Sequence, residues 1–181
     1  MVAEGITTGY QDGTFRPTGA VTRQALAAYI FRYNYYGLEA PRCTEAPFPD
    51  VPVDSPFCGQ IAWMAYYGLA QGYPDGTFRP NASVSRQAAA AFLERYTFYP
   101  DRYSEPTRFP DVGAGPFCTS ITFLSDGGIA EGYSDGTFRP TAEVTRQAIA
   151  AYLYRLDALF ESAAGAQLRA LPEGSPARRI P

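Results

Sequence analysis

The sequence predicts a mainly α-helical protein built from tandem helix–loop–helix repeats, and two observations support this prediction. A nine-residue motif, Gly-Tyr-x-Asp-Gly-Thr-Phe-Arg-Pro, occurs three times, over 9–17, 72–80 and 132–140. A pattern typical of an amphipathic helix follows each copy. Self-similarity at a nearly constant spacing is characteristic of repeat units that stack to share one core.

The helix after each motif is predicted by its cap and by the spacing of its apolar residues. Thr22, Ser85 and Thr145 are good N-caps, because their side-chain oxygen accepts a hydrogen bond from the first turn. Apolar residues then recur at helical spacing. They are Leu26, Tyr29, Ile30 and Tyr33 in the first copy, Ala89, Phe92, Leu93 and Tyr96 in the second, and Ile149, Tyr152, Leu153 and Leu156 in the third.

A second helix is expected upstream of the second and third motifs. Ser55-Pro56 and Gly115-Pro116 open it, with proline at the first helical position, and Gly68 and Gly128 end it. Its buried side is expected at Phe57, Ile61 and Met64 in one copy and at Phe117, Ile121 and Leu124 in the other. Only residues 1–5 precede the Gly-rich segment of the first copy, so the first repeat lacks its first helix.

The repeats predict four segments along the chain. They are a partial first repeat over 1–40, a second repeat over 41–100, a third over 101–160 and a flexible tail over 161–181. No signal peptide is present in the sequence. We therefore expect the chain to begin inside a longer protein, with the export signal in an N-terminal part that is missing here.

Composition excludes several classes of function. The net charge of −3 removes the electrostatic case for nucleic acid, and no apolar run approaches the roughly 20 residues that a membrane span needs. All 15 basic residues are arginine, and histidine is absent. The commonest general base and most zinc sites are thus missing, so we expect no metal, no cofactor and no catalysis.

The combination of motifs resembles the S-layer homology (SLH) repeat of bacterial cell-surface proteins. The shared features are Phe-Pro-Asp-Val, a helix ending in Gly-(Leu/Ile)-Ala-x-Gly-Tyr, Asp-Gly-Thr-Phe-x-Pro and Val-Thr-Arg, and they cover residues 5–156. The resemblance implies a pseudo-threefold helical spindle whose inter-repeat grooves bind secondary cell-wall polysaccharide, often bearing an acidic ketal-pyruvate. The family's ligand-contacting arginine matches Arg23, Arg86 and Arg146.

Two features depart from the family pattern. The family's glutamate after Thr-Arg-Ala is replaced by Ala25, Ala88 and Ala148, so a Thr-x-x-Glu capping box cannot form. The early aromatic residue of the first helix, Phe57 or Phe117, is followed by cysteine. These changes resemble a subset of the family from GC-rich Gram-positive, actinobacterial-like organisms.

Two interpretations of the three helix-start arginines stay open at the level of sequence. Each arginine follows an N-cap, where a cation faces the positive end of the helix dipole. In one interpretation it pairs with a motif carboxylate, Asp12, Asp75 or Asp135. In the other, the arginine and the free N–H groups of the helix start converge on an anion such as a pyruvate carboxylate.

The other candidate ligand residues have structural alternatives. The Asp-Gly pairs at Asp12, Asp75 and Asp135 favour tight turns over a calcium site. The arginine before each motif proline is expected in an extended segment, either framing the groove or facing solvent. The motif tyrosines and phenylalanines are expected as wedges between helices more than as sugar platforms. Trp63, the only tryptophan, could stack on a sugar or belong to the core.

The three cysteines fit an exported protein. Such a protein favours a disulfide between Cys43 and Cys58, which closes a short loop and leaves Cys118 unpaired.

The leading functional hypothesis is a secreted, non-catalytic module at the cell wall or cell surface. Its expected partner is secondary cell-wall polysaccharide or a peptidoglycan-linked glycan, with no nucleic acid and no membrane insertion. The alternative is a structural module that joins protein to protein in a surface layer. An enzyme with paired carboxylates is disfavoured, because such a pair needs unlike environments whereas the copies are alike.

Overall fold

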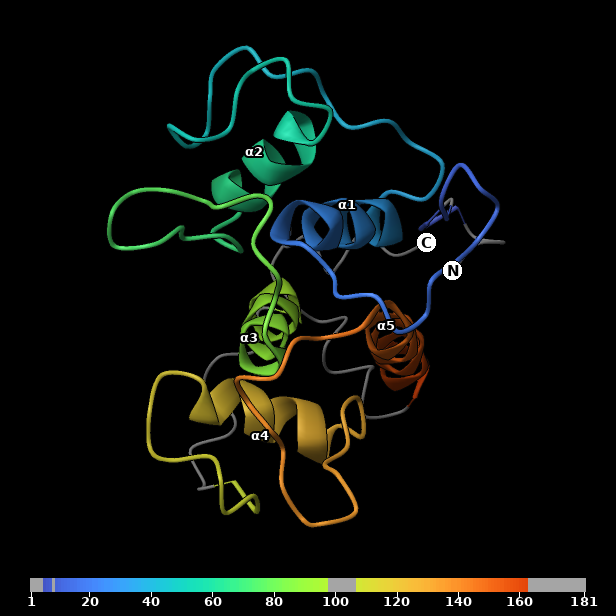
Figure 1. The fold of residues 1–181 in the computed structure, drawn as a ribbon, viewed down its shortest axis with the longest axis vertical. Helices are drawn as coiled ribbons and strands as arrows, with labels where there is room; N and C mark the ends of the chain where they lie inside the picture. Colours follow the sequence, from blue (N-terminus) through green and yellow to red (C-terminus); the bar gives the residue numbers. More distant parts are fainter. Residues whose placement is uncertain (1–4, 8, 98–106, 163–181) are drawn as a thin grey trace.

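The computed structural model describes residues 5–7, 9–97 and 107–162, and this part contains five α-helices and no strand (Figure 1). The helices are α1 (Arg23–Asn34), α2 (Cys58–Tyr66), α3 (Arg86–Thr97), α4 (Cys118–Asp126) and α5 (Arg146–Glu161). Helix α1 packs against α2, and α3 packs against α4. The helix after one motif therefore packs on the first helix of the next repeat. The mainly helical fold of tandem repeats is confirmed, and α1 is the first helix described. The tail expected over 161–181 lies, from residue 163 on, outside the described residues.

The predicted caps and cores of α1, α3 and α5 are confirmed. The hydroxyls of Thr22, Ser85 and Thr145 each accept a hydrogen bond from the N–H group three residues later. The apolar residues that the spacing selected are all buried apart from Tyr33, which is half-buried. Leu26, Ala89 and Ile149 occupy the same place in the three copies and are fully buried.

Helices α2 and α4 begin later than the sequence predicted. Proline is not at the first helical position, because Pro56 and Pro116 lie in a turn that precedes each helix. The N–H group of Cys58 closes the first turn on the Ser55 carbonyl at 3.0 Å, and Cys118 does the same in the other copy. The expected ends are confirmed, since Gly68 and Gly128 follow the helices with φ of +70° and +66°.

The three repeats close into a ring through the valine before each N-cap. Val21 donates its N–H group to the Val144 carbonyl at 3.0 Å, Val84 donates to Val21 at 2.8 Å, and Val144 donates to Val84 at 2.8 Å. All three valines are at most 1% exposed. Figure 1 shows the result: α1, α3 and α5 gather in the middle of the molecule, with α2 and α4 at its two ends.

Candidate functional site

The helix-start arginines connect each repeat to the next around the ring. Arg23 donates from Nε to the Phe78 carbonyl at 2.6 Å, and Arg86 and Arg146 make the same bond to the carbonyls of Phe138 and Phe15. Each arginine is only 7% exposed. The interpretation that they pair with the motif aspartates is therefore wrong, because their guanidinium groups cross to a neighbouring repeat instead.

The N–H groups of the helix starts are also occupied. Arg23 and Gln24 donate their N–H groups to the carbonyls of Ala82 and Pro80, at 2.9 and 3.0 Å. The third N–H group, of Ala25, bonds to the Thr22 hydroxyl, and the same arrangement recurs at α3 and α5. The hypothesis of free N–H groups that bind an anion is wrong, because carbonyls of the adjacent repeat fill these positions.

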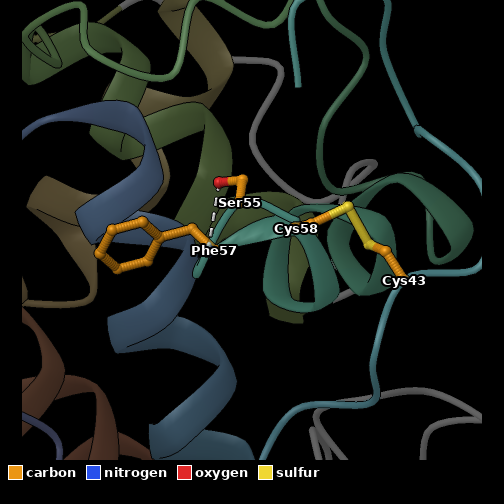
Figure 2. The surroundings of a disulfide bond; sticks show 4 residues. All are labelled: Cys43, Ser55, Phe57 and Cys58. Atoms are coloured by element: carbon orange, nitrogen blue, oxygen red, sulfur yellow. Dashed lines mark hydrogen bonds between the residues drawn. A yellow bond between two sulfur atoms is a disulfide. The ribbon is translucent and has the colours of Figure 1, made fainter. Parts of the chain in front are cut away.

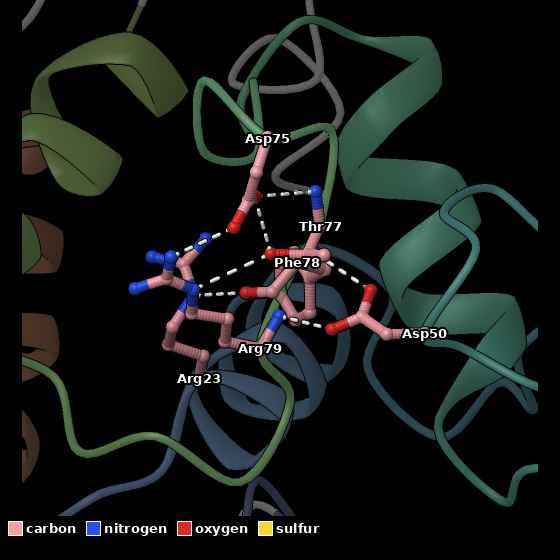
Figure 3. Close-up of polar contacts among 6 residues, drawn as sticks. All are labelled: Arg23, Asp50, Asp75, Thr77, Phe78 and Arg79. Atoms are coloured by element: carbon pink, nitrogen blue, oxygen red, sulfur yellow. Dashed lines mark hydrogen bonds and ion pairs between the residues drawn. The ribbon is translucent and has the colours of Figure 1, made fainter.

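The motif aspartates form tight turns, as the Asp-Gly pairs indicated. Asp75 Oδ1 accepts bonds from the N–H group and hydroxyl of Thr77, and its Oδ2 pairs with Arg79 at 2.8 Å (Figure 3). The hydrogen bond from the Thr77 hydroxyl has the larger effect and that from Arg79 the smaller, and together they hold the pKa of Asp75 well below its usual range. Asp12 and Asp135 have the same partners in their own copies, and all three aspartates are exposed.

The arginines before the motif prolines do not have the extended backbone that the sequence predicted. Arg16, Arg79 and Arg139 adopt φ of +53°, +57° and +54°, in the left-handed region that non-glycine residues rarely enter. In two copies a carboxylate holds this conformation: Asp50 accepts the N–H groups of Phe78 and Arg79 at 2.8 and 2.7 Å (Figure 3). Asp111 does the same in the third repeat.

Sequence reasoning missed the role of Asp50 and Asp111. Their recurrence in Phe-Pro-Asp-Val ahead of each motif was the available signal.

The aromatic residues of the repeated motif fall into two groups, one buried in the core and one partly exposed beside an arginine. Phe78 and Phe138 are fully buried, as expected of wedges. Tyr10 and Tyr133 are 38% and 40% exposed, and the guanidinium of the adjacent left-handed arginine lies 3.8 Å from each ring centre. These tyrosines are thus not wedges.

Trp63 lies in the contact between α1 and α2. It is 8% exposed and meets Phe31 and Tyr35 edge-on, with ring centres 5.5 and 5.8 Å apart. It also borders a cavity of about 570 Å³ beside the loop of Cys43. The structure therefore does not bring Trp63 together with the three arginines.

A groove of about 360 Å³ opens between the first and second repeats, and Phe117 of the third repeat also lines it. Its charged lining residues are Arg23 and Arg95, and Gln71, Ser85 and Gln87 supply further polar groups. No carboxylate lines it. Burial lowers the pKa of both Arg23 and Arg95. The groove suits an anion with several hydroxyl groups.

A disulfide joins Cys43 to Cys58, the pair expected from the sequence, with 5.8 Å between the Cα atoms (Figure 2). It ties the preceding loop to the start of α2. The loop can approach the helix because residue 59 is glycine. A side chain there would place its Cβ only 2.0 Å from the Pro41 carbonyl oxygen. Cys118 is a half-buried free thiol.

Two further properties bear on function. Among residues 5–7, 9–97 and 107–162, no helix has the length and apolarity needed to cross a bilayer. The same residues contain no cluster of three or more acidic or cysteine side chains that could hold a metal ion.

The described repeats thus form one closed helical body, with a groove lined by Arg23 and Arg95 between two of them. The family model of the S-layer homology domain matches residues 1–27, 47–90 and 108–150, more than half of the chain. The chain belongs to the S-layer homology domain family.

Curated relatives agree with this assignment. Cell surface glycoprotein 1 of Acetivibrio thermocellus is 32% identical over 166 residues, which is 81% of this chain and 7% of the relative. The cellulosome-anchoring protein of the same organism is 30% identical, over 48% of this chain and 20% of its own length. S-layer protein EA1 of Bacillus anthracis is 29% identical, over 59% of this chain and 12% of its own. The chain thus spans a fifth or less of these relatives.

Proposed function

We propose that this chain is a non-catalytic module that anchors its protein at the bacterial cell surface. It binds secondary cell-wall polysaccharide, with an acidic pyruvylated sugar as the preferred epitope, in a groove between repeats. The observation that carries the proposal is the groove between the first two repeats, where Arg23 and Arg95 stand without a lining carboxylate.

The lining residues match this ligand chemistry. A guanidinium binds a carboxylate through paired N–H donors, and these bonds are stronger in a partly dehydrated groove than in water. The amides of Gln71 and Gln87 and the hydroxyl of Ser85 can both donate to and accept from sugar hydroxyls. The names of the relatives, a cellulosome-anchoring protein and an S-layer protein among them, support a location at the surface.

Binding to cell-wall sacculi tests the proposal. The 181-residue chain should bind intact sacculi and should lose binding once acid has stripped the secondary polymer. Arg95→Gln should reduce binding, whereas Arg42→Gln, which removes the same charge from an exposed site outside the groove, should not. Equal binding to stripped and intact sacculi would contradict the proposal.

The alternative of protein–protein assembly has a separate readout. A self-assembling module should form large particles in the absence of wall polymer, which sedimentation velocity would detect. The anchoring proposal predicts that polymer binding does not require such particles. The assignment to a GC-rich Gram-positive subset stays a prediction, supported by the all-arginine composition.

A further inference from the structure

The three helix-start arginines occupy equivalent places but differ in how many of their donors are used. Arg86 bonds through all three of its nitrogens, to the Phe138 carbonyl, the Tyr152 hydroxyl at 2.7 Å and the Glu131 carbonyl at 2.9 Å. Arg146 is also bonded at all three, by the Phe15 carbonyl, the Tyr29 hydroxyl and the Thr7 hydroxyl.

Arg23 is different. Among the described residues only its Nε has a hydrogen-bond partner, the Phe78 carbonyl, and neither Nη group donates a hydrogen bond. One of the two missing bonds is explained by a missing hydroxyl. The residue six positions after the arginine is Tyr29 in α1 and Tyr152 in α5, but Phe92 in α3. The Phe92 ring lies 5.2 Å from the Arg23 guanidinium, and it has no hydroxyl to accept a bond.

Arg95 differs in a related way from its counterpart in the third repeat, Arg155. Arg95 and Arg155 stand at equivalent places in α3 and α5 and bond in the same way, to the carbonyls of Leu69 and Ile129. Arg155 also pairs with Glu131 at 3.7 Å. The residue equivalent to Glu131 is Gln71, so Arg95 has no carboxylate within ion-pair distance in the described part of the chain.

We infer that, among the described residues, the groove of Arg23 and Arg95 is the one that binds polysaccharide, and that Phe92 and Gln71 are the residues that make it so. The inference rests on the proposed function. The four N–H donors on the two Nη groups of Arg23 are free for a ligand carboxylate. The arginines of the other two places, Arg86 and Arg146, hold the repeats together and have no donor nitrogen left unbonded.

Exchange of groove residues tests this inference. The hydroxyl introduced by Phe92→Tyr should give Arg23 its missing acceptor. The carboxylate introduced by Gln71→Glu should pair with Arg95 as Glu131 pairs with Arg155. Because bonds to charged groups are strong, each change should weaken binding of purified wall polymer about tenfold or more in calorimetry. Tyr152→Phe and Glu131→Gln, which make the opposite changes in the other groove, should leave the wild-type affinity of the first groove intact.

The outcomes are distinguishable. Gln71 is exposed, so Gln71→Glu reports on binding even if Phe92→Tyr fails to fold. The inference is supported if the wild-type protein binds one polymer epitope per chain and the Gln71→Glu variant loses that binding. Wild-type binding that neither groove variant weakens, with the variants folded by circular dichroism, overturns it and leaves the proposed function standing. Wild-type protein that binds no wall polymer overturns the proposed function itself.

Discussion

At the scale of single residues, Asp50 and Asp111 fix the backbone of the motif. Burial alone would raise the pKa of Asp111, but bonds from the N–H groups of Phe138 and Arg139 outweigh it and lower the pKa. A left-handed arginine costs of order 1 kcal/mol or more, so it persists only where its surroundings hold it. Asp50 and Asp111 supply that constraint for Arg79 and Arg139.

Removing one of these carboxylates should destabilise the fold. In Asp50→Ala the N–H groups of Phe78 and Arg79 lose their charged acceptor, which we expect to cost about 1–3 kcal/mol of unfolding free energy. Urea denaturation measures the loss. Asp54→Ala, at an exposed aspartate nearby, is the control and should be close to neutral.

Titration of the Glu94 carboxyl should make the free energy of unfolding depend on pH. Burial raises the pKa of this carboxyl above its usual value, and the Ser120 hydroxyl, which donates to it, only partly opposes the shift. The folded-state pKa exceeds the unfolded one, so the contribution of Glu94 to stability is greatest at low pH and is lost as pH rises through the folded-state pKa.

Glu94→Gln abolishes this titration and still accepts a bond from Ser120. Its melting temperature relative to wild type should therefore be higher at about pH 7 than at about pH 3.5. A difference that is the same at both pH values would show that Glu94 titrates alike in the folded and unfolded states.

At the scale of elements, the motif turn depends on glycines used in two ways. Gly72 has φ of +69° and lies against Phe48, whose Cε1 would be 2.8 Å from an added Cβ. Gly76 has a similar φ of +79° but open space around it. The first glycine therefore serves both conformation and packing, and the second serves conformation alone.

Alanine substitution separates these two uses. Both Gly72→Ala and Gly76→Ala strain the backbone, but only Gly72→Ala also forces Phe48 away from its stacked partner Phe78. We expect Gly72→Ala to be less stable than Gly76→Ala by about 1 kcal/mol or more, measured by thermal unfolding. Equal losses would mean that Phe48 moves aside freely.

The helices could be predicted from the sequence and the site contacts could not, for a physical reason. Caps such as Thr22 and the buried stripe of α1 depend on residues a few positions apart, which the sequence displays directly. The partners of Arg23 and of the helix-start N–H groups come from the next repeat. Charge pairing inferred from the sequence therefore pointed to the motif aspartates, whereas the fold places the Phe78 carbonyl against Arg23.

At the scale of the whole molecule, the ring makes the repeats interdependent. In an open array each unit touches only its neighbours along the chain, whereas here the third repeat bonds directly to the first through Val144 and Val21. Unfolding of one repeat should remove contacts from both others. We therefore expect a single cooperative transition for all described helices.

A substitution at the ring tests this cooperativity. Val144→Asp buries an unpaired charge at the centre and should cost at least about 3 kcal/mol. Trp63 lies in α2, outside the third repeat, and gives a local fluorescence signal. Its urea midpoint should fall together with that of far-ultraviolet circular dichroism. A Trp63 midpoint that stays at the wild-type value would show that the second repeat unfolds independently.

The bonds that close the ring join main-chain atoms, which every amino acid except proline can provide equally. Closure therefore places little demand on the identity of side chains in the grooves. The second copy can have Phe92 where the other two have Tyr29 and Tyr152, and the ring is preserved. This separation lets the three repeats differ in groove side chains while they remain one folded body.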